Sequence, residues 1–236
     1  MHRLAPRAFL VLSLVPFLCG PAGAAGPERR EARVDASFAL QLDADGRIVS
    51  LQPVGRTAQG LDEVLRREVD DWTFEPGRID GRGVPTETTL NLTLAAGRAG
   101  DDDVALRIVD ASTGPRVART VPPRYPSRAL RAGESGEVLL QVAIDTDGRA
   151  TEVALAQSNT TPSLEQAAIA AVRQWTFQPE RVDGRPIAAR IVLPLRFCIT
   201  GRPCRRLPLA KGGGDSDHPR LVGAPTVRIV RPGGTG

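Results

Sequence analysis

Few side chains in this sequence could carry catalytic or metal chemistry. The 236 residues include only two histidines, His2 and His218, and three cysteines. Both histidines lie near the ends of the chain, so none stands in its central part to act as a general base. This excludes a Ser-His-Asp triad in its usual form, and the sequence has no glycine-rich phosphate loop. We therefore expect no catalytic residues, no metal site and no cofactor, in a protein that is not an enzyme.

Two acidic turns remain as candidates for metal binding. Asp43-Ala-Asp-Gly46 and Asp145-Thr-Asp-Gly148 carry alternating aspartates, as a calcium loop does. An EF-hand loop needs a longer series of ligands that ends in a glutamate between two helices. Neither segment has that series, and each is flanked by alternating apolar residues, which favours a hairpin turn closed by glycine.

A possible disulfide is the other chemical feature. Cys198 and Cys204 are separated by Gly201 and Pro203, which favour a turn, and an oxidising compartment would allow them to join. Two independent thiols in a tail are the alternative, and the sequence does not decide between them. The chain has no C-x-x-C, so we expect no redox-active site.

The N-terminus predicts the compartment. Arg3 and Arg7 flank the start of an apolar segment over residues 8–18, and Ala22-Gly23-Ala24 follows as a small-residue cleavage site. This is the three-part pattern of a secretory signal peptide, so we expect residues 1–24 to be removed on export. The segment is shorter than the roughly 20 apolar residues of a membrane span.

Two other interpretations of the N-terminus are weaker. Residues 8–26 contain no charge, so an uncleaved inner-membrane anchor is the first alternative. A lipoprotein acylated at Cys19 is the second, and it is disfavoured because Leu18 stands where a small residue is expected.

The net charge of +4 is carried by the ends of the chain. From Gly201 onward there are seven basic and two acidic residues, and the sequence there is rich in Gly and Pro without periodicity. We therefore expect residues 200–236 to be a flexible tail. Nucleic-acid binding would need a basic patch on the folded part, so we expect no nucleic-acid partner.

An internal repeat organises the middle of the chain. Eight of eleven positions match between residues 72–82 and 175–185, and Asp43-Ala-Asp-Gly-Arg47 recurs as Asp145-Thr-Asp-Gly-Arg149. The two blocks recur in the same order at nearly the same spacing, which predicts two related modules. We name residues 33–96 the upstream segment and residues 120–199 the downstream segment. We expect a linker over 97–119, in which residues 104–109 could form one strand.

The patterns predict the same α+β module in both segments. In the downstream segment, alternating apolar residues on either side of Asp147-Gly148 predict an antiparallel hairpin, and Thr161-Pro162 begins a helix. A third strand follows over residues 191–197, where Pro194 favours a sheet edge or a bulge. In the upstream segment residues 88–94 take that place. Each module is thus expected to be a hairpin, a packing helix and a third edge strand.

The downstream segment resembles the C-terminal domain of the TonB energy-transducer family. The resemblance rests on spaced positions that agree in order: Tyr125-Pro126, Ala129, Gly133, Gly136-Glu-Val138, Asp147-Gly148, Leu164, Ala167-Ala168, Ala171-Val172, Trp175-Thr-Phe-Gln-Pro179, Gly184-Arg-Pro-Ile187 and Phe197. The upstream segment resembles the same domain but lacks the leading Tyr-Pro part, so we interpret it as a degenerate second copy.

The resemblance implies a periplasmic protein-binding domain in a Gram-negative cell envelope. Such domains contact outer-membrane transporters by β-augmentation, in which an extended peptide pairs with an open sheet edge. The residues expected to meet the partner are Arg124, Tyr125, Arg128, Leu193, Leu195 and Phe197. Outer-membrane transporters or other envelope proteins are the expected partners, and a homodimer through the same edges stays open.

The chain departs from a standard transducer of this family. Those proteins have an N-terminal span and a long Pro-rich linker, whereas here the apolar segment is short and no Glu-Pro or Lys-Pro repeats follow it. We therefore expect a periplasmic docking protein. The alternative is an anchored transducer that works with inner-membrane motor proteins and couples the proton motive force to outer-membrane transport.

Overall fold

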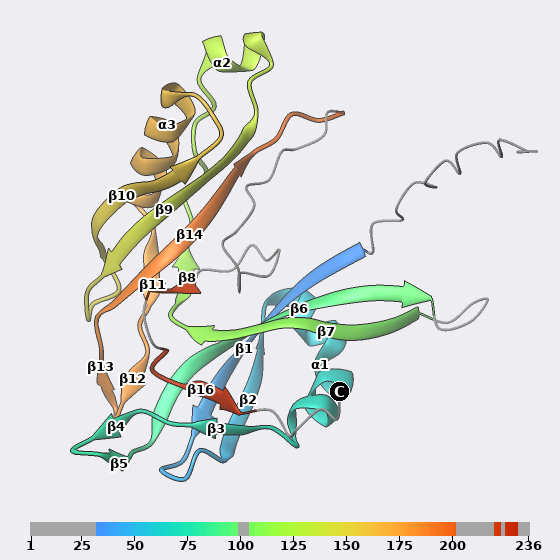
Figure 1. Cartoon of the computed structure of the whole chain (residues 1–236), viewed down its shortest axis with the longest axis vertical. Helices are drawn as coiled ribbons and strands as arrows, with labels where there is room; N and C mark the ends of the chain where they lie inside the picture. Colours follow the sequence, from blue (N-terminus) through green and yellow to red (C-terminus); the bar gives the residue numbers. More distant parts are fainter. Residues whose placement is uncertain (1–31, 99–103, 202–219, 223–224, 231–236) are drawn as a thin grey trace, which may run out of the picture. The chain divides into compact units, whose positions relative to one another are not determined.

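The computed structural model describes residues 32–98, 104–201, 220–222 and 225–230 (Figure 1). The expected signal peptide, its alternatives and Cys204 lie outside these residues. Within the described ranges, no helix is both long and apolar enough to cross a membrane. The elements are helices and, in larger number, strands, which confirms the predicted α+β class.

The upstream segment begins with a long hairpin and a helix. Its elements, in chain order, are β1 (Ala32–Leu42), β2 (Ile48–Val54), α1 (Gly55–Val69), β3 (Thr73–Glu75), β4 (Arg78–Ile79), β5 (Arg82–Gly83) and β6 (Thr86–Arg98). Strand β1 pairs antiparallel with both β2 and β6. Apolar residues of β1 and β6 form one buried core with Leu65 and Val69 of α1 and with Trp72 and Phe74, which follow this helix.

The expected linker contains two strands, β7 (Val104–Gly114) and β8 (Arg116–Arg119). Strand β7 pairs antiparallel with β6 from Thr89 to Arg98, while β1 pairs with the other side of β6. The expectation that residues 88–94 form an edge strand is therefore wrong. Alternation along β6 marks which side chains are buried, but it does not show whether one or two neighbouring strands pair with the backbone.

The downstream segment contributes strands to more than one sheet. Its elements, in chain order, are α2 (Ser127–Ala132), β9 (Gly136–Ile144), β10 (Ala150–Ser158), α3 (Pro162–Val172), β11 (Thr176–Gln178), β12 (Arg181–Val182), β13 (Arg185–Pro186) and β14 (Ala189–Phe197). One sheet has the strand order β10-β9-β14-β15, in which β15 (Arg220–Leu221) comes from the tail, whereas β12 and β13 extend the upstream sheet because β12 pairs with β6. Leu164, Ala168 and Val172 of α3 belong to the buried core of the downstream segment. Figure 1 shows α3 beside β9 and β10.

Two short strands lie within the expected flexible tail, β15 (Arg220–Leu221) and β16 (Arg228–Val230). Strand β15 pairs with β14, and β16 pairs with β3 of the upstream segment. Val227, next to β16, is completely buried and belongs to the upstream core. The described part of the tail is therefore integrated into both segments.

The two hairpin turns have matching geometry. One carboxylate oxygen of Asp43 accepts hydrogen bonds from the amides of Asp45 and Arg47, at 2.9 Å each. Asp145 accepts in the same way from the amides of Asp147 and Arg149, at 3.0 and 2.8 Å. These aspartates thus stabilise their own turns, and the prediction of hairpin turns is confirmed.

The two segments also correspond in a strand pair whose members are far apart in the sequence. Strand β8 pairs antiparallel with β11, and β16 pairs antiparallel with β3. Arg116 lies opposite Gln178 and donates a hydrogen bond to its side chain, while Arg228 lies opposite Glu75 and does the same. In the downstream segment, β11 thus pairs with a strand that precedes the segment in the chain. In the upstream segment, the corresponding strand β3 pairs with a strand from the C-terminal residues.

Candidate partner-binding edge

The outer side of β14 is the candidate site. Strand β9 pairs with all of β14, from Ala189 to Phe197, without a register shift. On the other side, β15 pairs with Ile191 and Val192, and no further strand pairing with that side is found among the described residues. The pairing on the outer side is therefore much shorter than the strand itself.

The direction of the backbone groups along β14 follows from one hydrogen bond. The amide of Val222 donates to the carbonyl oxygen of Arg190 at 2.7 Å, so the backbone of Arg190 faces the outer side. Backbone groups alternate along a strand, and Val192 and Pro194 therefore face the same side. Pro194 has no amide hydrogen, which explains how it fits within a strand that pairs fully with β9.

The opposite edge of this sheet is less regular. Among the strands that the structure describes, β10 pairs only with β9, and its register shifts twice, between Ala150 and Glu152 and between Leu155 and Gln157. Bulges interrupt the regular ladder that an added strand needs and are one way in which proteins protect an edge. Of the two edges, β14 is the better template for a guest strand.

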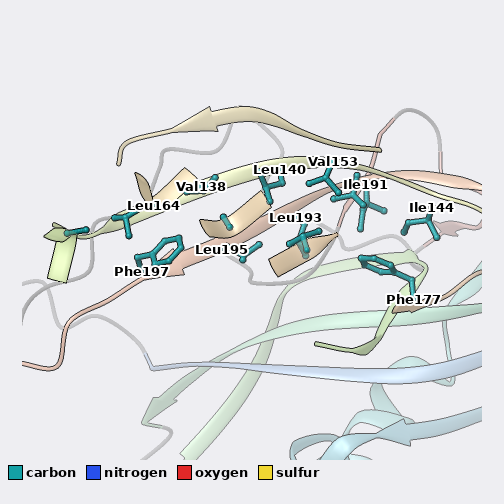
Figure 2. Packing of buried hydrophobic residues seen from close by; sticks show 14 residues of the cluster. Val138, Leu140, Ile144, Val153, Leu164, Phe177, Ile191, Leu193, Leu195 and Phe197 are labelled. Carbon is teal, nitrogen blue, oxygen red and sulfur yellow. The ribbon is translucent and has the colours of Figure 1, made fainter. Parts of the chain in front are cut away.

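Three of the predicted partner residues point into the core. Leu193, Leu195 and Phe197 are 2%, 6% and 3% exposed, and Figure 2 shows them in one row with Val138, Leu140 and Leu164. Their side chains cannot meet a partner without unpacking the domain. The contact predicted at these positions can therefore come only from the backbone of β14 or from its other face.

Tyr125 supports the end of this strand. Its ring meets the Phe197 ring edge-on, with centroids 5.5 Å apart, and its hydroxyl donates a hydrogen bond to the carbonyl oxygen of Glu134. Burial raises the pKa of the Tyr125 hydroxyl, and the charge of Glu134 acts in the same direction. Tyr125 thus has a packing role whether or not a partner touches it.

The two predicted arginines and Cys198 are placed differently. Arg124 lies before α2 and Arg128 within it, and both are exposed. Cys198 directly follows β14 and is disulfide-bonded, which fits the predicted bond, but Cys204 lies outside the described residues. The pairing of Cys198 with Cys204 therefore stays a prediction.

Glu180 was not singled out by the sequence. It lies between β11 and β12, is 1% exposed and accepts hydrogen bonds from the hydroxyls of Thr88 at 2.6 Å and Thr226 at 2.9 Å. Burial raises the pKa of Glu180, and the two hydroxyl donors lower it in part. In the alignment of the two repeats, Glu180 corresponds to Gly77. This difference within an otherwise similar block was the only sequence signal that could have pointed to Glu180.

The described residues show no candidate metal site. Among them, no group of three or more His, Cys, Asp or Glu side chains could hold a metal ion. What the outer side of β14 offers is a series of backbone donors and acceptors at Arg190, Val192 and Pro194.

A comparison with known protein families identifies the family that the downstream segment matches. Residues 121–199 match the family described as the Gram-negative bacterial TonB protein C-terminal. These residues are a TonB C-terminal domain. The family assignment predicted for the downstream segment is thus confirmed, and the TonB C-terminal domain comprises α2, α3 and strands β9 to β14.

Individual relatives support the same assignment. Protein TonB of Vibrio cholerae serotype O1 is 39% identical over 85 residues, which cover 36% of this chain and 35% of that protein. Protein TonB of Xanthomonas campestris pv. campestris is 40% identical over 78 residues, covering 33% of this chain and 35% of that protein. The chain thus spans about a third of the length of these curated relatives.

One solved structure is also similar. The solution NMR structure of Pseudomonas aeruginosa TonB CTD is 26% identical and covers 46% of this chain and 98% of that chain, with a TM-score of 0.33. A TM-score this low supports no statement about the fold.

Proposed function

We propose that this chain is a periplasmic protein-binding protein that docks envelope partners, such as TonB-dependent outer-membrane transporters, by β-augmentation at β14. The TonB C-terminal domain and its TonB-named relatives support an envelope function of this kind. The partner would be an extended peptide of an envelope protein, recognised mainly through its backbone.

The outer side of β14 carries the proposal. Arg190, Val192 and Pro194 turn their backbone groups to this side, and β15 covers only part of it. A guest strand would pair with the carbonyls of all three residues and the amides of the first two. Pro194 removes one donor and so limits how far the guest can pair toward the end of β14.

Side chains around this edge would provide specificity. Val192 and Pro194 are half-buried on the face of β14 opposite the core, and Arg124 and Arg128 are exposed on and before α2. The arginines would favour an acidic segment of the partner, at a strength that falls with salt because both are exposed. Tyr125 would act through its contact with Phe197.

The test is peptide binding with variants that change only the outer side. Val192→Pro removes an outward amide that β9 does not use, and Val192→Ala is the matched control that keeps the amide. We expect peptides from the N-terminal and plug regions of a transporter to bind the wild type, and binding to weaken about two- to tenfold in the proline variant, since one backbone hydrogen bond is lost. Failure of the wild type to bind at high micromolar concentration would count against the proposal.

We also propose that the upstream segment is a diverged second copy of the domain. Its support is the sequence repeat and the matching turns, in which the amides of Phe74 and Phe177 donate to the carbonyls of Gly46 and Gly148 at 3.3 and 2.8 Å. Its β6 has strands on both sides, so this copy would not offer the same edge. It would instead act as a support for the C-terminal residues of the chain.

An anchored energy transducer is the second candidate function. It is favoured by the relatives named Protein TonB and by the uncharged residues 8–26. N-terminal sequencing of the protein recovered from the cell envelope separates the two. A start at Ala25 supports the docking protein, and an intact N-terminus supports the transducer.

A further inference from the structure

The described C-terminal residues, 220–222 and 225–230, contact both segments of the chain. At one end, β15 pairs with β14 of the TonB C-terminal domain, and at the other, β16 pairs with β3 of the upstream segment (Figure 1). We name the described residues 220–222 and 225–230 the C-terminal strap. The strap lies on the edge to which the proposed function assigns the partner.

The strap takes the place of a guest strand. Strand β15 is antiparallel to β14, with Ile191 opposite Leu221 and Val192 opposite Arg220. The amide of Val222 continues this pairing to the carbonyl of Arg190 at 2.7 Å. These are the same outward backbone groups that β-augmentation requires, so a partner strand and β15 cannot use them together.

The far end of the strap is firmly held. Val227 is fully buried in the upstream core, and its carbonyl accepts a hydrogen bond from the Thr113 hydroxyl at 2.6 Å. The Thr226 hydroxyl donates to Glu180 at 2.9 Å, and Arg228 donates to Glu75. Release of this end would uncover apolar surface and leave buried polar groups without partners.

The near end is lightly held. Within the described residues, β15 has two residues, and Val222, which extends it, is 43% exposed. Opening this end breaks backbone hydrogen bonds between β15 and β14 that water can replace. The strap therefore has a fixed end and a releasable end, and the fixed end keeps the releasable end at high local concentration beside β14.

We infer that residues 220–222 are an intramolecular competitor for the partner-binding edge of β14. The strap is released at β15 while β16 stays in place, and a partner strand then takes its position. This inference rests on the proposed function for the identity of the partner, but occupancy of the edge by the strap can be measured without one.

The test uses the full chain with Val222→Pro, which removes the amide that donates to Arg190. Val222→Ala is the matched control, because it keeps the amide and changes only an exposed side chain. The first measurement is hydrogen exchange by NMR at Val192, whose amide faces β15, and at Leu193, whose amide faces β9. We expect exchange at Val192 to quicken about two- to tenfold in the proline variant, with Leu193 unchanged.

The second measurement is the affinity of a synthetic peptide that copies residues 217–224. We expect this peptide to bind the proline variant about two- to tenfold more tightly than the wild type or the alanine variant, because the edge is vacant more often. Unchanged exchange at Val192, or equal or absent binding of this peptide to all three proteins, overturns the inference.

The third measurement is the affinity of transporter N-terminal and plug peptides. Tighter binding to the proline variant than to the wild type supports competition. Equal binding to both overturns competition, although the proposed function stands. If these peptides bind no variant while the first two results hold, the proposed function fails and occupancy of the edge by the strap stands.

Discussion

Thr88 of β6 and Glu180 of the TonB C-terminal domain share a hydrogen bond of 2.6 Å although 92 residues separate them. Both residues are buried, and Thr88 also accepts a hydrogen bond from the amide of Gly114 at 3.1 Å. The other carboxylate oxygen of Glu180 accepts from Thr226 of the strap. One carboxyl group thus links the upstream segment, the downstream domain and the C-terminal strap.

This link predicts a pH dependence of stability. Burial raises the pKa of Glu180 in the folded chain, so the folded state holds this proton more tightly than the unfolded state does. The stability that Glu180 contributes is fully present below the ordinary pKa of 4.5 and is lost as pH rises through the raised pKa of the folded state. We expect Glu180→Gln to gain stability relative to the wild type as pH rises from about 4.5 to neutral.

The measurement is the free energy of unfolding by urea at several pH values. Thr226→Val is a useful companion, because loss of its hydroxyl removes a hydrogen bond that lowers the pKa of Glu180. This variant should lose stability relative to the wild type more steeply with rising pH. A difference between wild type and Glu180→Gln that stays constant from acid to neutral pH would contradict the assignment.

The matching turns predict matching effects of two glycine substitutions. Gly46 and Gly148 have φ angles of +81° and +79°, and an added Cβ would lie 1.8 and 2.0 Å from the carbonyl oxygens of Phe74 and Phe177. Since these contacts are with backbone, either alanine variant should lose about 2 kcal/mol or more of unfolding free energy.

Gly184→Ala is the control for backbone strain alone. Gly184 has a φ of +72°, but nothing lies within 4 Å of the position that an added Cβ would take, so this variant should lose only about 1 kcal/mol. Chemical denaturation of the three variants provides the comparison. A loss at Gly46 or Gly148 no greater than at Gly184 would show that the turns do not pack as described.

We expect Val227 of the C-terminal strap to stabilise the upstream core. Val227 is fully buried in the upstream core, so Val227→Ala should lower the free energy of unfolding by about 2 kcal/mol, from two lost methyl groups and the cavity they leave. Val230→Ala is the control, because Val230 is 40% exposed. Its expected loss is under about 0.5 kcal/mol. Equal effects at the two positions would mean that the strap does not complete this core.

A substitution at Leu193 tests whether its side chain packs in the core or contacts a partner. Its side chain is 2% exposed beneath β14, so Leu193→Ala should destabilise the chain by about 2–5 kcal/mol. Leu155→Ala is the control, with a side chain that is 43% exposed. Thermal unfolding measures both, and partner binding should be compared below the unfolding transition. A Leu193→Ala variant with wild-type stability would show that this side chain is not part of the core.

Several features of the downstream domain could be predicted from the sequence. The hairpin of β9 and β10 follows from alternating apolar residues around Asp147-Gly148, and α3 follows from Pro162 and a stripe of apolar residues. Pro194 favoured a sheet edge or a bulge: β14 pairs with β9 without a register shift, and the backbone of Pro194 faces its outer side. In each case a short stretch of sequence contains the whole physical signal.

The candidate site was predicted only in part. That β14 meets the partner stays a prediction, and Leu193, Leu195 and Phe197 are core residues whose side chains a partner cannot reach. Alternation identifies two faces of a strand without showing which face is covered. The edge of a sheet is a property of backbone pairing, and side-chain periodicity says little about it.

The sequence by itself determined the local units of this protein: which residues form hairpins and helices, where glycine and proline permit turns, and which family the downstream domain resembles. Only the tertiary structure decided that β7 covers β6, that β15 and β16 join the two segments, and that Glu180 is buried. The physical reason is distance along the chain. Strands of two or three residues have no periodicity to detect, and their pairing depends on which edges folding brings together.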